Sequence, residues 1–475
     1  FTQEGDVRSS LAKLLVESYK DAGIELEVPA GFLPYPVHPH QAQVLRDNTS
    51  MQQYVADGLI VELNAQGRAW RATSSTRALW QQDSRWMLKF SLAVKLTNSI
   101  RHLSPTELSR GVLFQQVSNE LAGAEFNQRF PDFTVLQEPA WCGIRDLAGE
   151  LMLDSLFCWR ENPFTSGAEP CVTLATMTQE SENGSNPIAE LVAQLASTQS
   201  LSLSIASSLW LERFLEHVIK PVAVARGDYG VVMLAHQQNL LVTLQGGLPV
   251  GGAFRDCQGT GFTDTALTRF PLLQENKPAY FADSEELNPY FSYYLILNSL
   301  NSVIAALATQ LTTDESRGLL HICQNFWMQQ AQHSFYDASF YTYLLQAENL
   351  KIKGNFFCFL GVKNETELQD PSRIYVDVAN PYQCEIVEDE QRIFKPLLNA
   401  ITPAPVDNAG LASGIRLTFK QARLADDDGL FTVESCWQQW HLQYRIDNSG
   451  GYHLSPAMDN KKLELDATLK RNGKM

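Results

Sequence analysis

The chain has 475 residues, of which 44% are hydrophobic and 19% are charged, and its formal net charge is -16. This composition is typical of a globular protein with roughly two to four domains, and the acidic balance argues against a nucleic-acid partner, which needs a basic surface. The eight cysteines are scattered and form no CxxC pair, so we expect free thiols in a reducing cytosol rather than zinc or redox chemistry. No stretch approaches the roughly 18 apolar residues of a transmembrane helix, so none is predicted.

The N-terminal region contains the first motif. A helical pattern over residues 8–23 ends at Gly23, and a proline-rich stretch that cannot be helical follows it. The motif HPHQ at 38–41 then opens a helix that we predict to run to about Asp57. His38 lies just before this helix, where a histidine either caps the helix or faces a ligand.

Residues 70–104 carry the most distinctive pattern in the chain. Hydroxyl residues run into Arg77, and an alternating segment with the periodicity of a β-strand follows. One parity is apolar: Trp86, Leu88, Phe90, Leu92, Val94 and Leu96. The other parity is polar: Lys89, Ser91, Lys95 and Thr97. We therefore predict one strand with a buried face and a polar face, which Arg101 continues if the chain stays extended.

The same stretch is a basic island in an acidic protein. Between residues 71 and 110, seven lysines and arginines are opposed only by Asp83 and Glu107, which indicates a focused anion site. Arginine binds phosphate through two nitrogens, lysine supplies a point charge, and hydroxyls donate to the remaining oxygens. The candidate phosphate ligands are Ser75, Thr76, Arg77, Lys89 and Arg101.

The next segment predicts a helix and then a boundary. Residues 104–107 (SPTE) have the composition of a capping box with proline at the first helical position, so a helix to about Phe130 should follow. A turn is predicted at 141–143. The polar residues 161–187 are typical of a loop or domain boundary.

A second constellation occupies residues 236–256 (HQQNLLVTLQGGLPVGGAFRD). Two apolar runs flank the Gly-Gly turn at 245–247, which predicts a β-hairpin. His236 and Asn239 precede the first strand and Asp256 follows the second, so the hairpin should bring the three together. An amide and a carboxylate oxygen suit Mg²⁺, and with the cations above they describe a nucleotide triphosphate site.

The motifs separate several nucleotide chemistries. The sequence has no Walker A pattern and no glycine-rich kinase loop, yet HQQN, a hairpin and Asp256 follow the logic of a kinase catalytic loop with its metal aspartate. Gln238 occupies the position of the kinase base. A carboxylate that attacks ATP needs no base, so carboxylate activation is favoured over phosphoryl transfer. Each piece alone also fits a structural role, as a serine-rich turn or a solvated strand face.

The remaining pattern is less specific. Residues 286–349 are predicted to be mostly helical, with their aromatic side chains in the core. Strands are expected at 354–359 and 373–378. Beyond about residue 400, alternating segments predict antiparallel strands.

Four segments together resemble the siderophore synthetases that work independently of non-ribosomal peptide synthetases, closest to the citrate-using, aerobactin-type branch. They are HPHQ at 38–41, SSTR with KFSLAVKLTNSIRHLS at 74–104, AHQQN with RDCQG at 235–259, and KGNFF at 353–357. His40 stands where the family usually has tryptophan. The family also has a thumb-like region of well over a hundred residues before HPHQ, of which we expect little in this chain.

The resemblance implies an enzyme that uses ATP and Mg²⁺ to adenylate a carboxylate, releases pyrophosphate and lets an amine attack the acyl-adenylate. By position it implies these ATP ligands: Ser75, Thr76, Arg77, Lys89, Arg101 and His236. It implies Asn239 and Asp256 as the metal ligands, and His38, Thr97 and Arg101 as contacts of the carboxylate substrate. The residues expected to act in catalysis are Lys89, Arg101 and His236.

The implied fold is an α+β multi-domain synthetase. We expect a finger-like domain at 1–185, a palm-like domain with the metal hairpin at 186–400 and an unassigned β-rich segment at 401–475. The expected partners are citrate, a citrate monoamide or 2-oxoglutarate, together with an amine such as N6-acetyl-N6-hydroxylysine. A cytoplasmic protein without nucleic-acid or membrane partners is expected, and a homodimer is left open. The alternatives are a kinase-like small-molecule phosphotransferase and a non-catalytic citrate- or nucleotide-binding protein.

Overall fold

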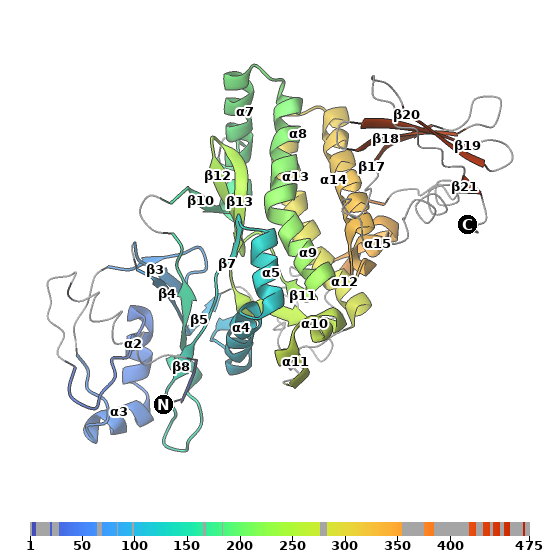
Figure 1. Cartoon of the computed structure of the whole chain (residues 1–475). Helices are drawn as coiled ribbons and strands as arrows, with labels where there is room; N and C mark the ends of the chain where they lie inside the picture. Colours follow the sequence, from blue (N-terminus) through green and yellow to red (C-terminus); the bar gives the residue numbers. More distant parts are fainter. Residues whose placement is uncertain are drawn as a thin grey trace. The chain divides into compact units, whose positions relative to one another are not determined.

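The computed structural model of the chain describes residues 2–5, 20, 28–63, 69–82, 84–96, 99–164, 168–182, 184–275, 283–353, 375–383, 418–423, 431–437, 440–446, 451–456 and 469–470. Its contacts divide the chain into two compact units, residues 1–384 and 385–475. The fold is a mixture of helices and sheets, as an α+β class requires (Figure 1). Apart from residue 20, the expected helix at 8–23 and the expected strand at 354–359 lie outside the described residues.

A six-stranded antiparallel sheet lies in the N-terminal half of the first unit, with the order β1-β8-β9-β4-β3-β2. Its strands are β1 (Thr2–Glu4), β8 (Trp141–Gly143), β9 (Phe157–Glu161), β4 (Trp86–Phe90), β3 (Ala78–Trp80) and β2 (Arg71–Ala72). The central strand β4 is buried on both faces. Its aromatic face packs on Phe157 and Trp159 from β9. Residues 141–143, predicted as a turn, are therefore a strand, because they pair with both neighbours.

The prediction of one strand up to residue 96 is wrong. The chain leaves the sheet after Phe90 and forms β5 (Leu92–Leu96), which pairs with β6 (Ser99–Arg101) in a separate two-stranded sheet. Arg101 consequently folds back opposite Leu92 instead of extending the face of Lys89. Lys95 is exposed whereas Lys89 is buried, so the two lysines do not share a face. Thr97 lies outside the described residues.

Short helices replace several longer ones that were predicted. The helix expected to reach Asp57 is split in two, because Asn48 caps a new helix through the amides of Ser50 and Met51. The two parts are α2 (Pro39–Arg46) and α3 (Thr49–Ala56). The helix after Ser104 is also split, into α4 (Pro105–Ser118) and α5 (Leu121–Arg129). Ser104 makes no side-chain capping hydrogen bond, so the predicted capping box is wrong although Pro105 does open the helix.

The predicted hairpin is confirmed. β12 (Leu240–Gln245) and β13 (Leu248–Phe254) pair antiparallel around Gly246 and Gly247, whose φ angles are 58° and 83°. Two successive residues with positive φ match the right-handed twist of a two-residue hairpin, which glycine allows without strain. The hairpin lies in a four-stranded sheet between β10 (Cys171–Thr173) and β7 (Phe133–Val135). With α6 (Leu174–Thr178), β10 gives the supposed loop 161–187 regular structure.

A layer of helices packs beside this sheet and holds most of the core (Figure 1). The helices are α7 (Pro187–Gln199), α8 (Leu203–Phe214), α9 (Lys220–Tyr229), α10 (Asp264–Arg269), α11 (Pro271–Glu275), α12 (Ser284–Ser292), α13 (Asn301–Ala308), α14 (Thr313–His333) and α15 (Ser339–Gln346). π-Helical turns at 215–219 and 293–300 join some of them. The run Glu286–Ala308 is apolar and long enough to cross a membrane, but 56% of its apolar window is buried, and a core helix passes the same test.

Short strand pairs complete the first unit: β11 (Val231–Met233) with β14 (Thr260–Phe262), and β15 (Asn349–Lys353) with β16 (Tyr375–Ala379). β16 confirms the strand expected at 373–378. Among the described cysteines, Cys142, Cys158, Cys171, Cys257 and Cys323 are free, as expected.

The second unit contains a five-stranded antiparallel sheet, which confirms the strands predicted after residue 400. Its strands are β17 (Thr418–Arg423), β18 (Phe431–Trp437), β19 (Trp440–Ile446), β20 (Gly451–Pro456) and β21 (Leu469–Lys470).

Candidate active site

The hydroxyl residues form a tight turn between β2 and β3. The amide of Thr73 donates to the carbonyl of Ala78 at 2.9 Å, and the amide of Thr76 donates to the carbonyl of Thr73 at 3.0 Å. Thr76 adopts a φ of 64°, in the left-handed region that non-glycine residues seldom enter. The hydroxyls of Thr73 and Ser75 lie 3.1 Å apart. The turn therefore gathers several hydroxyl and amide groups at one edge of the sheet, as a phosphate-binding loop requires.

Lys89 and Asp256, the centres of the two predicted constellations, are in direct contact. The Nζ atom of Lys89 lies 2.6 Å from Oδ1 of Asp256, and only 1% of the lysine side chain is exposed. Burial alone would raise the pKa of Asp256, but Lys89 and Arg160 hold it well below its ordinary value. Asp256 therefore stays ionised, and the strand and the hairpin meet at one ion pair whose lysine is buried.

Two residues of this network were missed by the sequence analysis. Glu138 lies 3.6 Å from Nζ of Lys89 and accepts two hydrogen bonds from Arg160, at 2.9 and 2.5 Å. Arg160 in turn lies 3.8 Å from Asp256. Burial disfavours the charged guanidinium, yet Glu138 and Asp256 raise the pKa of Arg160 above its ordinary value. The available signal was a lone arginine within the apolar segment of β9.

Arg77 ties the hydroxyl turn to the end of β6. Its Nη1 donates to the carbonyl oxygens of Arg101 and His102 at 3.2 and 3.0 Å. Burial, and then the nearby charge of Arg77, lower the pKa of Arg101. Two like charges held this close attract an anion, so the arrangement fits the predicted roles of both arginines toward phosphate or carboxylate.

His236 is a neutral group. Burial, together with the cations Arg255 and Lys353, lowers its pKa to about 4 against the opposing effect of Asp256. The amide of Gln238 donates to Nδ1 of His236 at 3.3 Å, so the ring proton resides on Nε2. His236 therefore can donate one hydrogen bond to an oxyanion without carrying a charge.

The predicted metal ligands fit a magnesium ion that is bound mainly by phosphates. Asn239 is buried. Its backbone carbonyl accepts a hydrogen bond from the backbone amide of Arg255 at 3.0 Å, which places Asn239 beside Asp256. Asp256 has a φ of 80° and keeps 30% of its side chain exposed. Among the described residues, no three histidine, cysteine or acidic side chains cluster to hold a metal alone. Mg²⁺ bound to substrate phosphates needs only one or two protein oxygens.

The HPHQ motif has a structural role, in which the predicted alternative of His38 as a helix cap is confirmed. Nδ1 of His38 accepts from the amide of His40 at 3.1 Å and so caps α2. Gln41 accepts from the amide of Ala93 at 2.9 Å and donates to Asp154 at 2.9 Å. The motif therefore fixes β5 beside α2, and the contact of His38 with a substrate stays a prediction.

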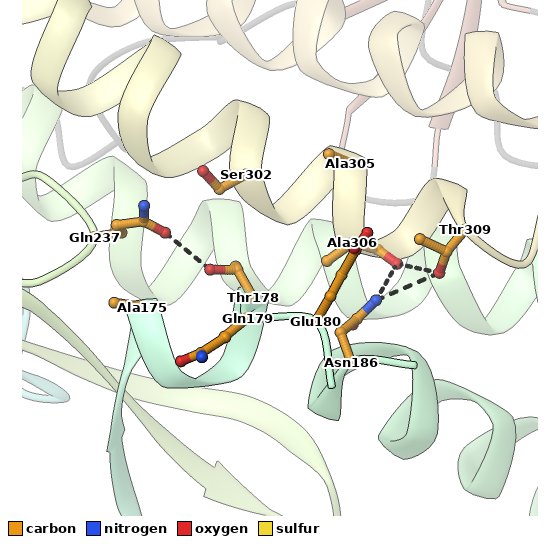
Figure 2. A pocket seen from close by; sticks show the side chains of 10 residues that line it. All are labelled: Ala175, Thr178, Gln179, Glu180, Asn186, Gln237, Ser302, Ala305, Ala306 and Thr309. Carbon is orange, nitrogen blue, oxygen red and sulfur yellow. Dashed lines mark hydrogen bonds between the residues drawn. The ribbon is translucent and has the colours of Figure 1, made fainter. Parts of the chain in front are cut away.

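A separate polar cavity of about 390 Å³ lies where α6, the start of α7 and α13 meet (Figure 2). Gln237 borders it and accepts a hydrogen bond from the hydroxyl of Thr178 at 2.8 Å. Glu180 is the charged residue among those that line it. The cavity contains none of the predicted site residues, although Gln237 belongs to the same loop as His236.

The comparisons with known proteins give the class. Residues 3–179 match the model of the IucA / IucC family, and residues 208–369 match a model described as ferric iron reductase FhuF-like transporter. The ATP-bound aerobactin synthetase IucA of Klebsiella pneumoniae has 34% sequence identity and a TM-score of 0.74, over 81% of this chain and 68% of that one. The chain therefore belongs to the IucA / IucC family.

Two curated relatives match the chain over a smaller share of their own length than the solved structure does. Both are N(2)-citryl-N(6)-acetyl-N(6)-hydroxylysine synthases. The protein of Vibrio mimicus is 40% identical over 73% of this chain and 58% of its own, and that of Escherichia coli is 35% identical over 74% and 62%. The chain thus spans about three fifths of the length of these two relatives.

Proposed function

We propose that the chain carries the nucleotide site of a ligase that uses ATP to join a citrate carboxylate to an amine in siderophore biosynthesis. The observation that carries this proposal is the 2.6 Å contact between Lys89 and Asp256. It joins β4, a strand of the same sheet as the hydroxyl turn, to a predicted metal-binding hairpin in a chain similar to an ATP-bound synthetase. In this proposal, the sheet that contains β4 belongs to the finger-like domain and the hairpin to the palm-like domain. The HQQN loop and Asp256 would have roles similar to those of the kinase catalytic loop and its metal-binding aspartate.

In the first step, a carboxylate oxygen of citrate attacks the α-phosphorus, and the bond to the β-phosphate oxygen breaks. Lys89, Arg77 and Arg101 would neutralise the triphosphate and lower the repulsion between the two anions. His236 would donate its Nε2 hydrogen to a phosphate oxygen. Asn239 and Asp256 would hold Mg²⁺, which supplies charge stabilisation for the leaving pyrophosphate.

The contact between Lys89 and Asp256 must loosen when the nucleotide binds. Lys89 neutralises the carboxylate as long as no phosphate competes for it. A triphosphate with its Mg²⁺ brings both a new anion for Lys89 and a new cation for Asp256. The exchange keeps every buried charge compensated, which is the condition for burying charges at low cost.

In the second step, the amine nitrogen attacks the acyl carbon, AMP leaves, and the nitrogen gives up a proton. The curated relatives are named for citryl and acetyl-hydroxylysine groups, which supports citrate and a hydroxamate-bearing amine here. A citrate monoamide or 2-oxoglutarate as the acid is tested beside citrate. The domain boundaries near 185 and 400, the homodimer and the cytoplasmic location stay predictions.

The test is a screen of carboxylic acids against amines with Mg-ATP and the native chain, read as pyrophosphate, AMP and ADP. We expect citrate with an N-hydroxylated lysine to yield equal amounts of pyrophosphate and AMP together with an amide. Production of ADP would identify a phosphotransferase instead. Calorimetric binding of citrate or ATP without any turnover would identify a binding protein and would overturn the proposal.

A further inference from the structure

Arg255 connects the two loops of the proposed nucleotide site, and the motif analysis gave it no role. Its guanidinium lies at the end of β13, where 5% of the residue is exposed. Nη2 makes a short hydrogen bond to the hydroxyl of Ser74. Nε and Nη2 both donate to the carbonyl of Gln238, at 3.1 and 2.7 Å. One side chain therefore binds the hydroxyl turn and the HQQN loop at once.

The bridge is closed by Gln238 itself. Its Nε2 donates to the carbonyl of Ser74 at 3.1 Å. The amide of Arg255 also donates to the carbonyl of Asn239 at 3.0 Å. These hydrogen bonds connect parts of the chain that are 164 and 181 residues apart. The spacing between the two loops is consequently set by one guanidinium and one amide.

The partners of Arg255 differ from those of the arginine that holds the helical core. Arg226, which is fully buried, binds the carboxylate of Asp337 at 2.8 Å. Within the described residues, the hydrogen bonds of Arg255 go to a hydroxyl and a carbonyl and to no carboxylate. A buried cation is costly unless an anion compensates it. Asp256, the carboxylate that interacts electrostatically with Arg255, is already shared between Lys89 and Arg160.

We propose that Arg255 is a positioning residue for the triphosphate of the nucleotide. Its guanidinium donors hold the Ser74 turn and the Gln238 loop at the spacing that the phosphates require. Its positive charge also attracts the phosphates to the site. Arginine suits this role because its planar guanidinium can bridge two acceptors, whereas lysine is a single flexible point charge. The inference rests on the proposed function, since it assumes that the nucleotide lies between these loops.

The test compares Arg255→Gln and Arg255→Lys with the native chain in citrate-dependent pyrophosphate release. For Arg255→Gln we expect the KM for ATP to rise by about tenfold to a hundredfold, because a charged hydrogen-bonding partner is lost, while the KM for citrate changes less than about twofold. Arg255→Lys keeps the charge but cannot bridge the two loops, so its KM for ATP should lie between those of the native chain and Arg255→Gln. Adding guanidinium ion to Arg255→Ala should restore part of the ATP affinity.

Arg269→Gln is the matched control. Arg269 lies on α10 and pairs with Glu125 at 2.7 Å, so its loss should leave both KM values unchanged. Thermal melting of each variant, with and without Mg-ATP, separates folding from binding. The positioning role would be overturned if an Arg255 variant melted at a lower temperature but was stabilised by Mg-ATP as much as the native chain. Equal rises in the KM values for ATP and citrate would also overturn it.

Direct titration of Mg-ATP separates this inference from the proposed function. If the native chain binds Mg-ATP but releases no pyrophosphate with any acid, the ligase proposal fails, and the dissociation constants of the Arg255 variants still decide the role of Arg255. If Arg255→Gln and Arg255→Lys bind Mg-ATP as tightly as the native chain, the inference is wrong even where turnover is found. Absence of Mg-ATP binding by the native chain would overturn both.

Discussion

Two buried charge networks in the described part of the first unit differ in how far they are open to solvent. Arg226 donates to Asp337 at 2.8 Å and to Ser339 at 3.0 Å, and it joins α9 to the segment before α15. Lys89 binds Asp256 at 2.6 Å and joins β4 to the hairpin. Both networks connect elements that are far apart in sequence and both bury a cation.

The difference lies in the carboxylates. Asp337 is 12% exposed and packs against a fully buried arginine, whereas Asp256 is 30% exposed and is shared by two cations. The Arg226 network therefore pairs one buried cation with one carboxylate that is largely shielded from solvent. The Lys89 network balances Lys89 and Arg160 against two carboxylates, Glu138 and Asp256. Asp256 faces solvent, so this carboxylate can exchange partners with a ligand. Burial of charge alone does not mark a site, but burial of a network with one carboxylate open to solvent does.

The largest effect should come from removing the cation of the open network. Lys89→Met keeps the length of the side chain and removes its charge, so we expect pyrophosphate release to fall by about a hundredfold to a thousandfold. Lys95→Met, on the exposed position of β5, is the matched control and should retain the native rate. Rates are measured per folded molecule, after circular dichroism. A Lys89 variant as active as the Lys95 variant would remove Lys89 from the site.

The closed network should respond in stability rather than in activity. Arg226→Met leaves Asp337 buried without its cation, so the free energy of unfolding should fall by about 3–5 kcal/mol. Urea denaturation measures this loss, and the KM for ATP of the remaining folded enzyme should be unchanged. A raised KM for ATP with native stability would contradict the distinction between the two networks.

Asp256→Asn tests the open side of the site with a smaller effect. The amide keeps the shape of the side chain and removes the charge that Mg²⁺ requires, so the Mg²⁺ concentration at half-maximal rate should rise by about tenfold to a hundredfold. A titration of pyrophosphate release with MgCl₂ at saturating ATP measures it. Asp154→Asn is the control, because Asp154 accepts a hydrogen bond from Gln41 of the HPHQ motif. It should leave the Mg²⁺ requirement unchanged. Superimposable titrations of Asp256→Asn and the native chain would exclude Asp256 as a metal ligand.

Local geometry explains which half of the site could be predicted. The hairpin depends on Gly246 and Gly247 and on two flanking apolar runs, all within twenty residues, so the sequence was sufficient to place Asn239 beside the strand that ends before Asp256. The proximity of Lys89 to Asp256 was also anticipated, because one triphosphate site needs both cations for the phosphates and oxygen ligands for Mg²⁺.

Non-local pairing explains what was missed. The alternation from 86 to 96 describes an amphipathic strand, but β4 is central in a sheet and both of its faces are covered. The end of β4 depends on the register with β9, which the sequence of β4 does not contain. Glu138 and Arg160 escaped notice for the same reason, since only the fold brings them to Lys89. Arg255 stood beside Asp256 in a recognised motif, yet one of its partners lies in the distant Ser74 turn.

The smallest expected effect concerns the neutral histidine of the open network. The pKa of His236 is about 4 in the folded chain and about 6.5 when unfolded. As the pH falls from 6.5 to about 4, the unfolded chain takes up a proton that the folded chain excludes, so the free energy of unfolding decreases. Between pH 7 and pH 5 this contribution is at most about 2 kcal/mol. His236→Gln should therefore lose less stability than the native chain over that range.

Urea denaturation at pH 7, 6 and 5 measures the difference, and His321→Gln on the exposed face of α14 controls for the loss of any histidine. The native chain and the His321 variant should show the same dependence on pH, with His236→Gln less steep. Equal slopes for all three would mean that His236 binds its proton as readily in the folded chain as in the unfolded one. His236 would then be charged at mildly acidic pH and would contact phosphate as a cation, and the open network would contain one more titratable charge than the geometry assigns to it.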